Sequence, residues 1–226
     1  LVRRQDETLS DFFAVLDSEV GRDNYLLVLT ADHGRPERPE HLAHQGHDPS
    51  RNGQTALAEA LNTEIASAFG VEGAVKAFFR PYIYLDHEAI AAAKADRRAI
   101  ERLIVDSLQA VPGIALATPS VPFPERRDNF FDGPIRRNFH PERSGDIYVV
   151  QSPYSFLLDP GAIAAMHGSP WRYDTHVPVL FAGPGIAAQR VSRSIGTVDV
   201  AVTLSEIFGT TYPSGASGSV LFEVAD

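Results

Sequence analysis

The chain has 226 residues, of which 44% are hydrophobic and 22% charged, a composition that indicates a folded globular protein and argues against disorder. Its net charge of −9 comes from 29 acidic and 20 basic residues without a basic stripe, so nucleic acid is a poor candidate as a bulk partner. No apolar run approaches the roughly 18 residues of a membrane span, and because cysteine is absent any metal must take histidine and carboxylate ligands.

The first predicted element is a helix over residues 8–20. Its apolar face comprises Leu9, Phe12, Phe13, Leu16 and Val20. Leu1 is not an initiator methionine, and the helix begins without a cap or lead-in. We therefore expect the chain to be cut from something longer.

A strand and a second helix follow. Residues 25–30 form a continuous apolar run, typical of a strand buried on both faces of a parallel sheet. Leu57, Leu61 and Ile65, spaced by four, predict a helix over residues 55–69. Helix, strand and helix in this order indicate an α/β layer.

The middle of the chain has a different pattern. Residues 82–85 and 114–117 are short strand candidates, and Asp96 caps a helix that reaches residue 108. Residues 119–143, rich in Pro, Arg, Asn and Asp, predict a long irregular connection. We expect a small α+β lobe or lid here, inserted into the main layer.

The main layer resumes with strands over residues 146–151 and 177–182. Gly183-Pro-Gly185 then marks a turn, and residues 198–208 form a last amphipathic helix. The chain therefore returns to the α/β pattern with which it began.

Candidate metal ligands follow the first strand, in Thr30-Ala-Asp-His-Gly34. Ligands of an open α/β sheet gather beyond the carboxyl ends of its strands, where Asp32 and His33 fall. Carboxylate and imidazole suit Zn²⁺ in a chain without cysteine, and Gly34 allows a sharp turn around an ion. The alternative is an aspartate that caps the next helix with a histidine packed beside it.

A third imidazole, His176, lies just before the strand over residues 177–182. Its neighbours Asp174 and Thr175 either orient the imidazole or shape the turn into the strand, and both alternatives stay open. The preceding segment His167-Gly-Ser-Pro170 fits a plain turn better than a pocket lining.

A second histidine-rich segment contains His41, His44, His47 and Asp48. Gly46, Pro49 and the polar surroundings favour a solvated loop, with adventitious metal binding as the alternative.

The segments Leu27–Gly34 and Tyr173–Gly185 resemble two metal-site motifs of the alkaline phosphatase superfamily. The resemblance is to the branch of bacterial monomeric phosphatases and nucleotide pyrophosphatase/phosphodiesterases, and Gly196–Gly209 is similar to the family's closing helix. It implies an α/β fold, namely a partial alkaline phosphatase-like α/β/α sandwich. The chain would be only the C-terminal portion of such a protein. Residues 1–79 and 144–226 would be the two parts of this core, and residues 80–143 the inserted lobe or lid.

The resemblance also implies roles. Asp32 and His33 would bind the metal that activates the nucleophile, and His176 the metal that stabilises the leaving group, with zinc as both ions. The family's early Asp, its Thr or Ser nucleophile and its Asp-x-x-x-His pair come earlier in the family order. We therefore expect the nucleophile upstream of Leu1 and no activity from this chain alone.

The implied function is hydrolysis of a small phosphate ester, as a phosphomonoesterase or phosphodiesterase. Sulfatases and phosphoglycerate mutases share the superfamily and are less favoured. An alternative of another class is an inactive module that binds a partner or a lone metal. We also expect self-association of the chain, and the resemblance implies periplasmic or secreted localisation for the parent protein, although the sequence leaves the compartment open.

Overall fold

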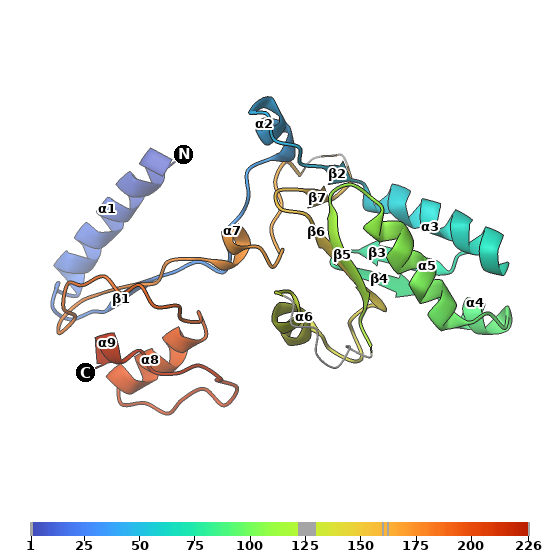
Figure 1. Ribbon diagram of the computed structural model, residues 1–226. Coiled ribbons are helices and arrows are strands. Elements are labelled where there is room, and N and C mark those ends of the chain that lie inside the picture. Colours follow the sequence, from blue (N-terminus) through green and yellow to red (C-terminus); the bar gives the residue numbers. More distant parts are fainter. Residues whose placement is uncertain (1, 122–129, 160, 162, 226) are drawn as a thin grey trace. The chain divides into compact units, whose positions relative to one another are not determined.

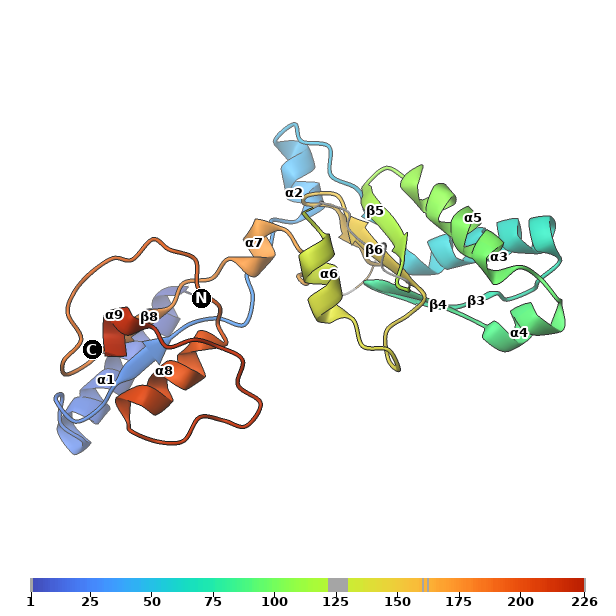
Figure 2. The same cartoon turned by 60° about the horizontal axis from the view of Figure 1, so that its bottom comes forward.

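The computed structural model describes residues 2–121, 130–159, 161 and 163–225. The chain divides into two compact units, one formed by residues 33–176 and the other by residues 1–32 together with 177–226. Figures 1 and 2 show the elements of each unit.

The larger unit contains six helices and six strands among its described residues. They are α2 (Pro39–His44), β2 (Arg51–Asn52), α3 (Gln54–Phe69), β3 (Val75–Phe79), β4 (Tyr82–Leu85), α4 (His87–Ala92), α5 (Arg97–Gln109), β5 (Ile114–Pro119), α6 (Asp132–Asn138), β6 (Ile147–Gln151), β7 (Phe156–Leu157) and α7 (Arg172–Thr175). The described part of the smaller unit has α1 (Val2–Glu19), β1 (Leu27–Leu29), β8 (Leu180–Ala182), α8 (Asp199–Ile207) and α9 (Phe222–Ala225).

The larger unit is built on a four-stranded antiparallel sheet in the order β3-β4-β6-β5. Helices α3 and α5 run side by side and pack against it (Figure 1). Ile100, Ile104 and Leu108, at most 1% exposed, recur every four residues on α5 and form the stripe that this contact buries. A helix-period apolar pattern thus fixes the face that α5 turns to the sheet.

Strand β6 is buried on both faces of this sheet. Ile147 and Val149 belong to the core that includes α3 and α5, whereas Tyr148 and Val150 pack with Ile135 of α6. The alternation follows from the two-residue period of a strand. Its continuous apolar sequence therefore reflects a central strand covered from two sides.

The smaller unit has little buried surface around its strands. β1 pairs antiparallel with β8, with Leu29 opposite Leu180, and these two side chains are 53% and 52% exposed. The expectation of a strand buried on both faces of a parallel sheet is therefore wrong for β1 in this chain. A short apolar run carries no information on strand direction or on which elements cover it.

Three helices expected from periodicity, over residues 55–69, 96–108 and 198–208, are confirmed as α3, α5 and α8. The Asp96 side chain accepts a hydrogen bond from the Arg98 amide at 2.9 Å, as an N-cap does. The helix expected over residues 8–20 is longer, because α1 begins at Val2.

Several short helices were not expected, and two of them change earlier interpretations. Helix α2 contains His41 and His44, which the sequence assigned to a solvated loop, and Pro39 occupies its first turn, where proline is tolerated. Helix α6 lies inside the connection over residues 119–143. Residues 122–129 of that connection are outside the described residues.

The compact units end at positions other than the predicted domain boundaries. β3 pairs with β4 across the predicted boundary between residues 79 and 80, and β6 pairs with β4 and β5 across the one between residues 143 and 144. The division into 1–79, 80–143 and 144–226 stays a prediction. In the described part of the chain, no helix has the length and apolarity to cross a bilayer.

Candidate functional site

Asp32 and His33 follow β1 directly, and the chain passes there from the smaller unit into the larger one. Asp32 is exposed and His33 half-buried. The His33 Nδ1 atom lies 2.7 Å from the carbonyl oxygen of Gly34. Because a carbonyl can only accept, this contact assigns a ring hydrogen to Nδ1, and in the neutral ring the lone pair is then on Nε2.

Gly34 joins the two predicted motifs. Its amide donates a hydrogen bond to the carbonyl of Asp174 at 2.8 Å. A Cβ atom at this position would overlap the carbonyl oxygen of Tyr173. The glycine is therefore needed for close backbone approach, and not for the sharp turn that the sequence suggested.

His176 follows the one-turn helix α7, and its amide donates to the Arg172 carbonyl at 2.9 Å. The side chain is exposed. His176 and His33 thus each lie within two positions of the Gly34–Asp174 hydrogen bond. The backbone brings these distant parts of the sequence together.

Asp174 is 4% exposed. Its Oδ2 atom accepts hydrogen bonds from the Ser169 amide at 2.8 Å and from the Ser169 hydroxyl at 2.5 Å. Among the described residues, its Oδ1 atom has no hydrogen-bond partner. These contacts favour the turn-shaping alternative for Asp174 over a direct contact with an imidazole.

The His167 ring stacks on the His33 ring. Their centroids are 3.5 Å apart and their planes differ by 5°. The Arg80 guanidinium, from the turn between β3 and β4, donates to the His167 carbonyl at 2.8 Å. Sequence reasoning assigned His167 to a plain turn and missed this contact, for which no local pattern gives a signal.

The donor types of Asp32, His33 and His176 fit a divalent metal. A metal-binding histidine usually donates its second ring nitrogen to a carbonyl or carboxylate, and the His33 Nδ1 contact with Gly34 has that form. Within the described ranges, however, no three His, Asp or Glu side chains form a group that could hold a metal. The three donors are thus at most part of a metal site, and their role as ligands stays a prediction.

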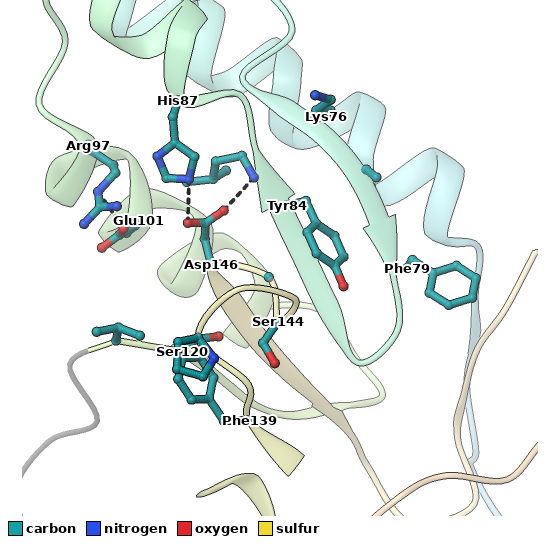
Figure 3. A pocket seen from close by; sticks show the side chains of 15 residues that line it. Lys76, Phe79, Tyr84, His87, Arg97, Glu101, Ser120, Phe139, Ser144 and Asp146 are labelled. Carbon is teal, nitrogen blue, oxygen red and sulfur yellow. Dashed lines mark hydrogen bonds and ion pairs between the residues drawn. The ribbon is translucent and has the colours of Figure 1, made fainter.

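A pocket of about 840 Å³ lies elsewhere in the larger unit (Figure 3). His87 Nε2 and Asp146 Oδ1 are 2.9 Å apart on its wall, and Asp146 Oδ2 accepts from the Leu85 amide at 2.8 Å. Burial raises the pKa of the nearby Glu101 carboxyl, against the opposing charge of Arg97 at 3.2 Å. None of the predicted metal ligands lines this pocket.

Comparison with known proteins identifies the class of fold. No family model matches the chain. The structure is similar to the crystal structure of wild-type alkaline phosphatase PafA, with a TM-score of 0.83 and 26% identity over 99% of this chain and 42% of that one. The chain therefore has a partial alkaline phosphatase-like α/β fold.

Two relatives extend the likeness to sequence. Alkaline phosphatase PhoV of Synechococcus elongatus is 31% identical over 98% of this chain and 40% of its own length. A protein named calcium-transporting ATPase, from Myroides odoratus, is 30% identical over 99% of this chain and 41% of its own length. The chain thus spans about 40% of these relatives. The resemblance to the alkaline phosphatase superfamily is confirmed, and the chain fits the C-terminal portion of such a protein.

Proposed function

We propose that the protein to which this chain belongs hydrolyses phosphate esters at a centre of two zinc ions. Asp32 and His33 would hold one ion, and His176 the other. The observation that carries this proposal is the 2.8 Å hydrogen bond from Gly34 to Asp174, which joins the two motifs in a fold similar to that of an alkaline phosphatase.

A metal pair supplies charge neutralisation for the phosphoryl group and for the attacking and leaving oxygens. This chain contributes one carboxylate and two imidazoles to that task. With His33 Nδ1 on the Gly34 carbonyl, Nε2 would be the ring nitrogen that binds the metal. The nucleophile, a Thr or Ser by the resemblance, lies outside this chain, so the chain alone is expected to be inactive.

The substrate class is a small phosphate ester. The superfamily branch suggested by the motifs includes both monoesterases and diesterases, and one relative is named as an ATPase. A substrate panel therefore needs p-nitrophenyl phosphate, bis-p-nitrophenyl phosphate and ATP. An aryl sulfate is added to the panel to test the less favoured sulfatase alternative.

The test uses the full-length protein, stripped with a chelator and reloaded with zinc. We expect two zinc ions per chain and restored phosphate-ester turnover. Asp32→Asn and His176→Ala should each lower zinc content and reduce turnover by about 100-fold or more, because ligand loss exceeds the usual 10–100-fold effect of outer partners. His140→Ala, at an exposed histidine of the larger unit outside the segment over residues 41–48, is the matched control. Absence of turnover with every divalent metal would contradict the proposal.

The competing proposal is a catalytically inactive module with a partial metal site. It is favoured by the lack of a three-donor group among the described residues. One weak metal site and no hydrolysis in the full-length protein would support it, and two metals per chain would exclude it.

The isolated chain should also self-associate. Leu9, Phe12 and Val15 of α1 are 47%, 52% and 58% exposed, and no residue of this helix is buried. Leu29 and Leu180 add exposed apolar surface on the β1–β8 pair. Apolar surface of this kind marks an interaction site or an aggregation hazard.

A further inference from the structure

The His33 ring has a flat partner on one face. Its centroid lies 3.5 Å from that of His167, with nearly parallel planes. Rotation of the His33 ring about the Cβ–Cγ bond would drive an edge into His167. The stack therefore restricts the direction in which the ring nitrogens of His33 point.

The position of His167 is itself fixed by a half-buried cation. Arg80 Nη1 donates to the His167 carbonyl at 2.8 Å, and Nη2 lies 3.5 Å from Met166 Sδ. Burial lowers the pKa of the Arg80 guanidinium, and the negative charge of Asp174 opposes that shift. Gly168, with φ of +95°, then turns the chain away in a conformation that favours glycine.

The same loop also fixes the backbone beside His33. Two hydrogen bonds from Ser169 hold the Asp174 carboxylate, and the Asp174 carbonyl accepts from the Gly34 amide. The segment over residues 167–174 thus contacts both the ring of His33 and the next peptide. Two residues further on, the same segment presents His176.

We propose that His167 is a positioning residue for His33. By covering one ring face it keeps Nδ1 on the Gly34 carbonyl, so that Nε2 is presented to a divalent metal in one direction. Parallel stacked rings direct their in-plane lone pairs alongside each other, so His167 acts through His33 and does not share an ion with it. This inference rests on the proposed function, because it assigns His33 a metal.

The test compares His167→Ala, which removes the flat face, with His167→Phe, which retains it, in the full-length protein. Zinc affinity is measured by competition with a chromogenic chelator. We expect His167→Ala to weaken zinc binding about tenfold, as loss of an outer partner does, and His167→Phe to recover most of that loss. The exposed-histidine control His140→Ala should bind zinc as the wild type does.

A second readout needs no metal. Long-range ¹H–¹⁵N correlation of the histidine rings, above the usual histidine pKa of about 6.5, reports the His33 tautomer. The wild type and His167→Phe should show hydrogen on Nδ1, and His167→Ala a mixture of tautomers. If His167→Ala does not fold, His167→Gln fills part of the volume without a ring and takes its place.

The outcomes separate the two proposals. Wild-type zinc affinity in His167→Ala, or an unchanged His33 tautomer, overturns the positioning role and leaves the proposed function intact. Equal losses of zinc affinity in His167→Ala and His167→Phe also overturn it, because a flat ring at position 167 would then not be enough to position His33. A wild type that binds no zinc overturns the proposed function, and the metal role of His167 with it.

Discussion

Ser169 donates two hydrogen bonds to one carboxylate oxygen of Asp174, from its amide at 2.8 Å and from its hydroxyl at 2.5 Å. Both side chains are at most 5% exposed. A buried carboxylate is costly unless donors satisfy it, and here one serine supplies two of them. The pair closes the loop that leads to His176, so its stability and the geometry of the candidate site are linked.

Asp174→Ala should lower the free energy of unfolding by about 2–4 kcal/mol, because it leaves both Ser169 donors buried without an acceptor. Asp174→Asn keeps one oxygen and should cost less. Urea denaturation measures both. The exposed Asp48→Ala is the control and should stay within about 0.5 kcal/mol of the wild type. Equal stability of Asp174→Ala and this control would show that the pair contributes little.

Gly34→Ala should be destabilising by about 1–3 kcal/mol, the range for overpacking, because the new methyl group overlaps the Tyr173 carbonyl. The backbone segments that contain Gly34 and Tyr173 must move apart, and the hydrogen bond from Gly34 to Asp174 then lengthens or breaks. Gly215→Ala is a suitable control, since a Cβ there meets nothing within 4 Å. Thermal unfolding measures the stability of both variants. If Gly34→Ala is as stable as the wild type, the two motifs are not in close contact.

Glu101 predicts a pH dependence of stability. It is 7% exposed, and burial raises the pKa of its carboxyl in the folded state above the ordinary glutamate value. At a pH between the unfolded and the folded pKa, the folded protein binds more protons than the unfolded chain. The contribution of Glu101 to the free energy of unfolding is therefore fully present below the unfolded pKa and is lost as pH rises through the folded pKa. Glu101→Gln cannot ionise and should gain stability relative to the wild type over that window.

The Glu101 experiment requires urea denaturation of both proteins at several pH values from about 4 to 7, a range that brackets the usual glutamate pKa. Glu59→Gln, on an exposed face of α3, provides the control and should show no such trend. If the free energies of unfolding of Glu101→Gln and the wild type differ by the same amount at every pH, burial does not raise the pKa of Glu101.

Phe12→Gln should reduce self-association of the isolated chain, because it removes an apolar side chain that is 52% exposed on α1. The neighbouring Asp11→Gln alters an exposed polar position and should leave association unchanged. Sedimentation velocity at several concentrations distinguishes the species. A monodisperse wild-type monomer would contradict the expectation.

Periodicity in the sequence was sufficient for the elements of the larger unit that have a strong local pattern. The four-residue spacing of Ile100, Ile104 and Leu108 predicted α5, and Asp96 marked its beginning. Short helices were missed, because α2 and α6 have six and seven residues and too few turns to show a period. The candidate ligands Asp32, His33 and His176 could be named from motifs alone, because their residue types and neighbours are local features.

The sequence by itself determined the α/β class, the position of the two motifs and the resemblance to alkaline phosphatases, since all three depend on which residues lie near one another along the chain. Only the tertiary structure decided that β1 pairs antiparallel with β8, that Gly34 contacts Asp174 and that His167 stacks on His33. These contacts join residues far apart in the sequence, and Arg80 and Ser169 hold the loop that carries the second and third of them. No local pattern encodes that packing.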